Sequence, residues 1–215
     1  LDAPEEELEL ADGQVRIADI PEKSINLGEL AVIANPMRGT VEPGTEPGLE
    51  STDYFGPQTG ATASGAHAMI IEVDPETMMV EIKRYVSVED CGTVLNPLIL
   101  EGQIQGGISM GIGNAYYEQL IYDEQGQILN ASFMDYLVPR ATDMPIQMEM
   151  GHEETPSPWN VLGSKGVGEA GAIPVPSLFA QAIESALPEY ELEILEMPLS
   201  PNKLFDLTQM ANNRG

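Results

Sequence analysis

The chain has 215 residues, enough for one large domain or two small ones. Apolar residues make up 42% of it and charged residues 20%, a composition that supports a folded core and excludes global disorder. Acidic residues outnumber basic ones by 35 to 9, and a chain with a formal charge of −26 repels nucleic acids and anionic membrane surfaces.

Cysteine and histidine are scarce. The single cysteine, Cys91, excludes an intrachain disulfide and indicates a reducing compartment, so we expect a cytoplasmic protein. His67 and His152, with one thiol, do not form a zinc cluster at any familiar spacing, and we expect no metal ligands among these residues. The sequence contains no run of about 18 apolar residues, so it predicts no membrane span. The acidic start LDAPEEELELADG differs from a signal peptide.

The first predicted elements are a hairpin and a helix. Residues 7–17 alternate between apolar and polar around Asp12-Gly13, which predicts two strands joined by a tight turn. The stretch INLGELAVIA then predicts a helix capped by Ser24 or Asn26 and ended before the next proline.

Residues 38–65 are rich in Gly, Pro, Thr and Ser, and we expect a long loop there. Two strong strand patterns follow, His67 to Asp74 and Met79 to Val88, separated by the turn Pro75-Glu76-Thr77-Met78. They predict a β-hairpin with one buried face.

Residues 99–121 predict a glycine-rich helix. Gly102, Gly106, Ser109 and Gly113 fall on one face at helical spacing. Glycine costs about 1 kcal/mol in a helix interior relative to alanine, so this face is expected to meet something at close range. Tight helix–helix packing and a ligand lying against the helix are both compatible with the pattern.

The last part of the chain combines both element types. Residues 141–163 are predicted to be irregular. Strands are predicted near Ile128 to Phe133 and in ELEILEMPL, and helices from Pro176 to about Leu187 and from Ser200 to Met210. Strand pairs mixed with helices, without βαβ alternation, predict an α+β fold in which β-hairpins and a mixed sheet pack with helices.

The stretch GSKGVGEAGA, residues 163–172, matches the dinucleotide-binding pattern G-x-G-x-x-G. That pattern needs a buried strand before it and a helix opening within it. Only Val161-Leu162 are consecutive aliphatic residues before it, and Pro174 and Pro176 occupy the expected first helical turns. A Rossmann turn is therefore not expected, and a phosphate-binding P-loop is excluded because glycine follows Lys165.

What remains is a loop of closely spaced glycines that carries one carboxylate, Glu169. Glycines let backbone N–H groups approach a bound group because no Cβ intervenes. A glutamate held there can accept a proton at a reacting centre. An ordinary turn with a solvated glutamate fits the same letters.

Three motifs in order resemble the molybdenum hydroxylase large subunits, the family of xanthine dehydrogenase, aldehyde oxidase and aerobic carbon monoxide dehydrogenase. GAHAMIIEVDPETMMVEIKRYVSVEDCG resembles the hairpin of that family. EDCGTVLNPLILEGQIQGGISMGIGNAYYE resembles its D-C-G, N-P and E-G-Q-x-x-G-G segments, and GSKGVGEAGA resembles its catalytic loop. The likeness runs over almost the whole chain and is nearest to the carbon monoxide dehydrogenase-like branch.

The resemblance implies a molybdopterin cofactor with molybdenum, commonly as the cytosine dinucleotide, and an oxidative hydroxylation. It implies that Glu169 is the general base and that Gln103 lies at the pterin. It also implies that the cofactor approaches Gly106 and Gly107, and that the loop residues Gly166, Val167 and Gly168 contact it. The chemistry belongs to the cofactor, and the protein supplies placement and proton transfer.

The resemblance also implies partner subunits and the part of the large subunit that this chain represents. Iron–sulfur clusters and FAD are expected on partner subunits, and residues 1–215 are expected to be the C-terminal portion of the large subunit, inactive without its remainder. Carbon monoxide, aldehyde and heterocycle substrates all stay open. The sequence departs from the family at Ser109-Met110 and at Pro174, which puts cofactor contacts from the first pair in doubt and predicts a stiffer exit from the loop.

A different class of function stays open beside this one. The strongly acidic chain is also compatible with a non-catalytic domain that only assembles with partner subunits. A catalytic or metal-binding role for Cys91 is disfavoured, because a lone cysteine after a strand is more often a small buried apolar residue. His67 and His152 are expected to be structural or surface residues.

Overall fold

The computed structural model describes residues 1–38, 41, 43–44, 46–57 and 59–213. It divides into two compact units, Leu1–Gly56 and Pro57–Gly215. Part of the predicted loop 38–65 falls on positions 39, 40, 42, 45 and 58, outside the described residues. Within the described chain no helix is long and apolar enough to cross a membrane.

The first unit is a three-stranded antiparallel sheet, β1 (Leu8–Ala11), β2 (Gln14–Ile17) and β3 (Ile20–Asn26), followed by α1 (Leu27–Ile33). Short 3-10 turns, Glu5–Glu7 and Pro36–Arg38, lie before and after these elements. The predicted hairpin is confirmed: Asp12 and Gly13 both have positive φ, as the tight hairpin turn requires.

The cap of α1 is the Asn26 side chain, which accepts a hydrogen bond from the Gly28 N–H at 2.7 Å. Of the two predicted caps, Ser24 is wrong, because it lies inside β3 opposite Arg16. Strand β3 was not predicted from the sequence, because its residues IPEKSIN are mostly exposed and lack the apolar alternation of a half-buried strand.

The second unit begins with the predicted hairpin, which is confirmed and longer than expected: β4 (Ser64–Val73) pairs with β5 (Val80–Asp90). The register shifts between Ile70 and Ile71, where β5 carries one extra residue. This bulge resets the alternation of side chains, so both Ile82 and Tyr85 face the core.

Residues 141–163 are not wholly irregular, as the sequence predicted, because β6 (Gln147–Glu153) pairs in parallel with β5. A 3-10 turn, Ala141–Asp143, precedes it. QMEMGHE has a weak apolar pattern and takes its strand form from pairing with β5, a contact between distant segments that local propensity does not report. An exposed ion pair, Arg84 to Glu149 at 2.8 Å, spans the two strands.

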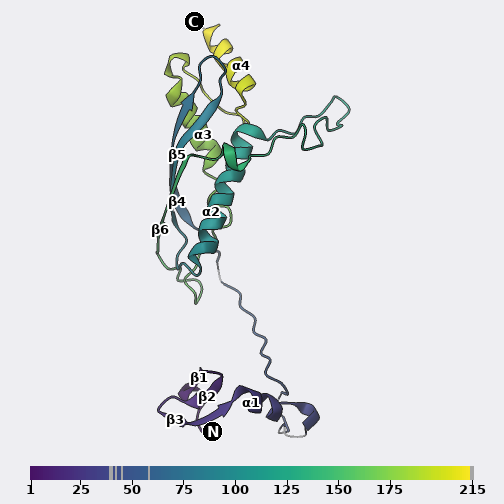
Figure 1. Ribbon diagram of the computed structural model, residues 1–215, viewed down its shortest axis with the longest axis vertical. Coiled ribbons are helices and arrows are strands. Elements are labelled where there is room, and N and C mark those ends of the chain that lie inside the picture. The colour runs from purple at the N-terminus through teal and green to yellow at the C-terminus, as the bar shows by residue number, and fades with distance from the viewer. Residues whose placement is uncertain (39–40, 42, 45, 58, 214–215) are drawn as a thin grey trace. The chain divides into compact units, whose positions relative to one another are not determined.

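Between β5 and β6 the chain forms α2 (Pro97–Ile112), which Asn96 caps by accepting from the Ile99 N–H. The predicted helix is confirmed, although a π-type turn, Gly113–Tyr117, ends it before residue 121. Residues 118–140 then project from the sheet and helices of this unit (Figure 1). The strand predicted at 128–133 is wrong: only one bridge forms, between Tyr122 and Ile128.

The chain ends with α3 (Val175–Ala186), a short 3-10 turn (Pro188–Tyr190) and α4 (Pro201–Asn212), which confirms both predicted helices. Ser200 caps α4 by accepting from the Lys203 N–H. The strand predicted in ELEILEMPL is wrong. Most of its apolar residues pack on the core, although Leu195 is exposed. Its backbone N–H groups bond to the Glu184 side chain and the Ala115 carbonyl instead of to a strand.

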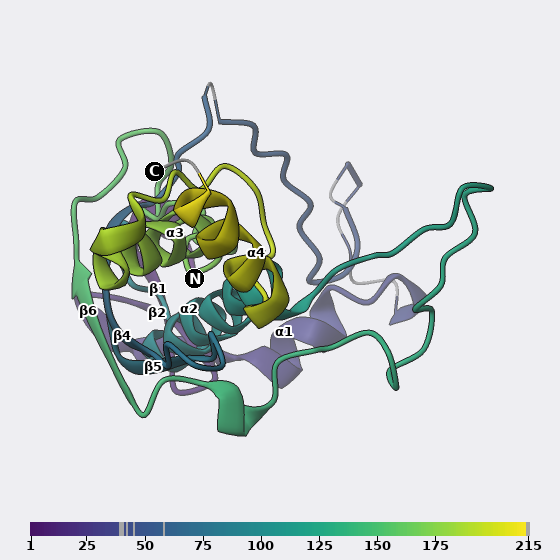
Figure 2. The same cartoon turned by 90° about the horizontal axis from the view of Figure 1, so that it is seen from above.

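Helices α2 and α3 lie on the same side of the β4–β5–β6 sheet (Figures 1 and 2). Between them and the sheet lie fully buried side chains that include Tyr85, Ile104, Ile108, Phe179 and Ile183. The expected α+β class is confirmed, with two small sheets and four α-helices among the described residues. The core fixes α2 against the open end of the hairpin, where the glycine-rich loop lies.

Candidate functional site

The glycine-rich loop is held at the end of the β4–β5 hairpin away from its tight turn. The Gly166 N–H donates to the Ala61 carbonyl at 2.7 Å, and the Ala63 N–H donates to the Gly166 carbonyl at 2.9 Å. The Lys165 N–H donates to the Cys91 carbonyl at 2.8 Å. The loop therefore lies between the chain that enters β4 and the chain that leaves β5, and not between a buried strand and a helix as a Rossmann turn would.

Two glycines make this crossing possible. Gly92 and Gly163 both have positive φ, near +65° and +69°. A Cβ on Gly92 would overlap the Gly163 carbonyl oxygen, and a Cβ on Gly163 would lie 2.7 Å from the Thr93 hydroxyl. Positive φ and the short distances both exclude a side chain at Gly92 and Gly163. The D-C-G segment therefore contacts the loop through backbone atoms.

On its other side the loop packs on the backbone of α2. A Cβ on Gly107 would lie 3.0 Å from the Gly171 Cα, and one on Gly111 would lie 2.6 Å from the Val175 Cβ. A Cβ on Gly171 would overlap the Ile104 carbonyl oxygen. Close approach of backbone explains why α2 tolerates glycines on this face.

The glycine face named from the sequence behaves differently. A Cβ added at Gly102 or Gly106 would meet no atom of the described chain within 4 Å. No helix of the described chain packs tightly on these two positions. Both glycines are exposed on α2, and Gly106 borders a cavity.

That cavity, of about 480 Å³, lies between α2 and the loop. It brings together five of the seven residues predicted for the site, and Asn114 beside them; the predicted ones are Gln103, Gly106, Gly107, Gly168 and Glu169. A Cβ added at Gly168 would lie 3.9 Å from the Gln103 amide nitrogen, so helix and loop meet at the cavity edge.

Glu169 is exposed at this cavity, and no described side chain hydrogen-bonds to its carboxylate. Its backbone is fixed, because its carbonyl accepts from the N–H groups of Ala172 at 2.9 Å and Ile173 at 3.1 Å. The arrangement is a hydrogen-bonded backbone that presents an exposed carboxylate at the cavity.

The other two predicted residues lie elsewhere. Gly166 forms an isolated β-bridge with Thr62. Val167 lines a neighbouring cavity of about 280 Å³ together with Cys91 and Lys165. Gln103 borders both cavities. The structure therefore does not bring Gly166 or Val167 into the cavity that contains Glu169.

Chemically, the Glu169 cavity offers two uncharged amides, Gln103 and Asn114, beside open glycine backbone and one carboxylate. Amide side chains both donate and accept hydrogen bonds. Such a set suits a flat heterocyclic ligand with amide-like edges. Among the described residues, no group of three or more His, Cys, Asp or Glu side chains has the geometry to hold a metal ion.

A polar contact behind the loop was not predicted from the sequence. The Asp90 carboxylate accepts from the Gly92 and Thr155 N–H groups and from the Lys165 ammonium, each at 3.0 Å. These donors, the Thr155 N–H first among them, hold the pKa of Asp90 well below its usual range. In the sequence, only the position of the D-C-G motif at the end of a predicted strand could have indicated this contact.

Cys91 is buried at 4% exposure, as expected for a small apolar residue. Burial raises the pKa of its thiol, and the nearby carboxylates Asp90, Glu154 and Glu89 raise it further. A thiol kept protonated in this way is a poor nucleophile and a poor metal ligand.

His67 is a structural residue buried in the sheet. Its Nε2 pairs with the Glu89 carboxylate at 2.5 Å and its Nδ1 with the Tyr85 hydroxyl at 2.7 Å. Burial and the Glu89 charge raise the pKa of Tyr85. The ring nitrogens of His152 make no hydrogen bond within the described chain, and the Glu101 carboxylate lies 3.9 Å from Nε2.

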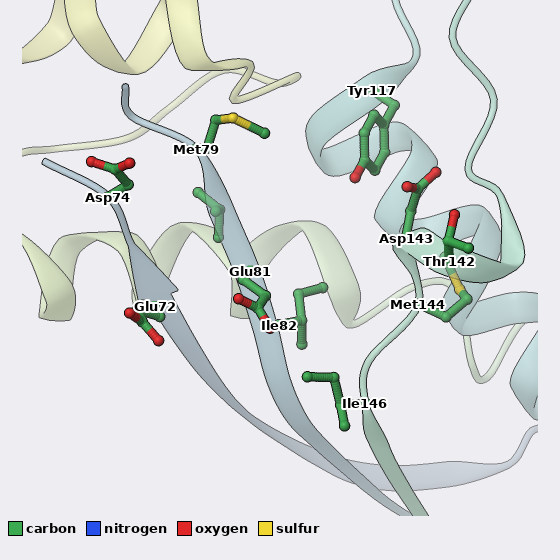
Figure 3. A pocket seen from close by; sticks show the side chains of 11 residues that line it. Glu72, Asp74, Met79, Glu81, Ile82, Tyr117, Thr142, Asp143, Met144 and Ile146 are labelled. Carbon is green, nitrogen blue, oxygen red and sulfur yellow. The ribbon is translucent and has the colours of Figure 1, made fainter. Parts of the chain in front are cut away.

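A separate acidic cavity, of about 630 Å³, lies at the turn end of the hairpin, away from the glycine-rich loop (Figure 3). Its carboxylates already have partners: Lys83 binds Glu72 and Glu81, Arg140 binds Asp143, and Asp74 accepts from the Glu76 and Thr77 N–H groups. Burial beside Asp143 raises the pKa of Tyr117 to about 12. None of these groups is a free base, so the Glu169 cavity is the better candidate site.

Known proteins resemble this chain along most of its length. Residues 1–145 match the model of a family described as the molybdopterin cofactor-binding domain. The chain is 36% identical over 209 residues to the nicotine 6-hydroxylase large subunit of Paenarthrobacter nicotinovorans, covering 97% of this chain and 26% of that protein.

It is 34% identical to the carbon monoxide dehydrogenase large chain of Afipia carboxidovorans, over 92% of this chain and 24% of that protein. The crystal structure of quinoline 2-oxidoreductase from Pseudomonas putida 86 superposes with a TM-score of 0.83 and 38% identity, over 97% of this chain and 26% of that one. The chain thus spans about a quarter of the length of the relatives it matches.

Proposed function

The chain belongs to the molybdopterin cofactor-binding domain family, in the molybdenum hydroxylase large subunits, and we propose that it forms one wall of the cofactor site and supplies Glu169 as general base. The observation that carries the proposal is the single cavity that Gln103, Gly106, Gly107, Gly168 and Glu169 share. The relatives are named as a hydroxylase, a dehydrogenase and an oxidoreductase, and the name of a related carbon monoxide dehydrogenase of known structure includes copper and molybdenum. An oxidative hydroxylation is therefore the reaction proposed for the complete protein.

The residues of the cavity fit the cofactor. The open face of Gly106 provides space where a Cβ would otherwise stand, and Gly168 offers a similar surface on the loop. Gln103 and Asn114 supply the donors and acceptors that the edge of a pterin requires. We propose that Gln103 and the glycines hold the pterin, and that Gly166 and Val167 act by shaping the loop and the neighbouring cavity. The cytosine dinucleotide form belongs to the same proposal.

When bound, the molybdenum group supplies the oxidising centre and takes up the electrons removed from the substrate. Glu169 accepts the proton released as oxygen adds to the substrate. Its fixed backbone keeps the carboxylate at the cavity, and the absence of a competing hydrogen bond in the described chain leaves it free to act.

The substrate class follows from the relatives only as a proposal: carbon monoxide, an aldehyde or a nitrogen heterocycle. The names of the relatives, large subunit and large chain, support a multi-subunit enzyme. We propose that the remainder of the large subunit completes the site and that iron–sulfur and FAD subunits carry the electrons away.

The test is Glu169→Gln in the complete enzyme, with molybdenum content verified. Loss of a general base lowers turnover by about 10²- to 10⁴-fold, so we expect a loss in that range at saturating substrate. Glu189→Gln is the matched control, because Glu189 is exposed in the 3-10 turn after α3 and does not line the cavity. Near-normal turnover of Glu169→Gln would remove the general-base role.

Molybdenum content tests the alternative of a non-catalytic assembly domain. About one molybdenum per large subunit, lost when Gln103 is replaced by alanine, supports the cofactor site. Equal metal content in the wild type and the Gln103→Ala variant would contradict the assignment of Gln103 to the pterin.

A further inference from the structure

The loop that presents Glu169 is attached to the rest of the unit at its N-terminal side by one charged contact. Asp90 at the end of β5 receives three donors from three segments: the Gly92 N–H, the Thr155 N–H and the Lys165 ammonium. One carboxylate therefore joins the strand end, the segment before the loop and the loop itself.

Lys165 is held twice, by its ammonium to Asp90 at 3.0 Å and by its N–H to the Cys91 carbonyl at 2.8 Å. The next residue, Gly166, is held on both sides by Ala61 and Ala63. Only Val167 and Gly168 separate this anchored pair from Glu169. Because so few residues separate them, a displacement of Lys165 is expected to move Glu169 as well.

The other side of the loop is already fixed. Ala170 donates to the Val167 carbonyl at 3.1 Å, and Gly171 lies against the backbone of Ile104. The Asp90–Lys165 contact thus fixes the N-terminal side of the loop. Both side chains are largely buried, with Asp90 19% exposed and Lys165 16% exposed. An ion pair shielded in this way, with two further backbone donors on the same carboxylate, has a defined geometry that exposed pairs lack.

We propose that Asp90 and Lys165 are positioning residues that set where Glu169 stands at the cavity. The inference rests on the proposed role of Glu169, and neither residue touches the Glu169 cavity itself. A small misplacement of a reacting group is enough to reduce turnover strongly, because catalysis depends on near-attack geometry.

The experiment uses the complete enzyme with the variants Asp90→Asn, Lys165→Met and Lys165→Arg, with molybdenum content measured for each. Hydrogen–deuterium exchange of the peptide that contains Lys165 and Gly166 reports loop opening directly. Loss of a charge-assisted hydrogen bond should speed this exchange by about tenfold or more, while peptides of β4 keep their protection.

Turnover provides the second readout. We expect kcat to fall by about 10- to 100-fold in Asp90→Asn and Lys165→Met, with KM little changed, as for supporting residues behind a reactive group. Lys165→Arg keeps the charge and is expected to restore much of kcat. Arg84→Met is the matched control: it removes the cross-strand pair with Glu149 and should change neither readout.

Unchanged loop exchange in Lys165→Met, or unchanged kcat in that variant, would overturn the inference. Lys165→Met leaves the Asp90 contacts with Gly92 and Thr155 in place, so the test holds even where Asp90→Asn does not assemble. Glu169→Gln is measured alongside. Near-normal turnover there would remove the base role alone, while the exchange data still decide whether the pair positions the loop.

Discussion

Gly171 of the loop and Ile104 of α2 touch through their backbones, so closely that a methyl group on Gly171 would overlap the Ile104 carbonyl oxygen. Gln103 precedes Ile104 on the helix, and Glu169 stands two positions before Gly171 on the loop. The contact therefore brings the helix residue and the loop carboxylate to the same cavity. Glycine at 171 is the condition for that approach.

The packing of α2 on the loop segment predicts opposite effects for two glycine substitutions. Gly111→Ala places a Cβ 2.6 Å from the Val175 Cβ, and such overpacking costs about 1–3 kcal/mol. Gly102→Ala meets no described atom within 4 Å and gains helix propensity of about 1 kcal/mol. Melting temperatures of the two purified variants should fall and rise respectively, and a fall in both would contradict the open face of Gly102.

Gly106→Ala separates the stability of the fold from cofactor binding. Its Cβ would meet no described atom within 4 Å, so the melting temperature should be unchanged or higher. The same Cβ projects where Gly106 borders the cavity, so the variant should retain less molybdenum than Gly102→Ala. Full molybdenum occupancy in Gly106→Ala would show that the cofactor does not approach this glycine.

The contacts of Asp90 predict an acid-dependent stability. A carboxylate whose pKa is lower in the folded state than its ordinary value of 3.8 stabilises the fold above that value, and this contribution is lost as the pH falls toward the folded pKa. Asp74, Asp143 and Glu149 also have lowered pKa values, so wild type must be compared with Asp90→Asn. The stability difference should be largest above about pH 4 and shrink below it. A difference that grows on acidification would contradict the assignment.

The two histidines predict unequal costs on replacement by alanine. His67→Ala leaves the Glu89 carboxylate, 1% exposed, without its partner, and breaking a buried pair costs about 3–5 kcal/mol. The His152 ring has no hydrogen bond in the described chain, so His152→Ala should cost about 1 kcal/mol. Denaturant midpoints of the purified variants check the order, and equal midpoints would contradict it.

Local pattern was informative where one short segment decides its own structure. Alternation around Asp12-Gly13 predicted the first hairpin, and the strands flanking Pro75–Met78 were predicted correctly. Capping side chains marked the starts of α1 and α4. Sequence patterns failed where the structure of a segment depends on contacts with a segment far away in the sequence. Strand β6 exists because β5 offers it an edge, while ELEILEMPL alternates because it packs on the core without a strand beside it.

The sequence by itself determined the α+β class, the family likeness and the choice of Glu169 and Gln103, because the motifs that carry them are contiguous. Only the tertiary structure decided which glycines pack and which stay open, since Gly107 and Gly111 meet the loop segment while Gly102 and Gly106 meet nothing described. It alone joined Asp90 to Lys165. The physical reason is that close approach and charge pairing depend on distances between segments far apart along the chain, which no local pattern encodes.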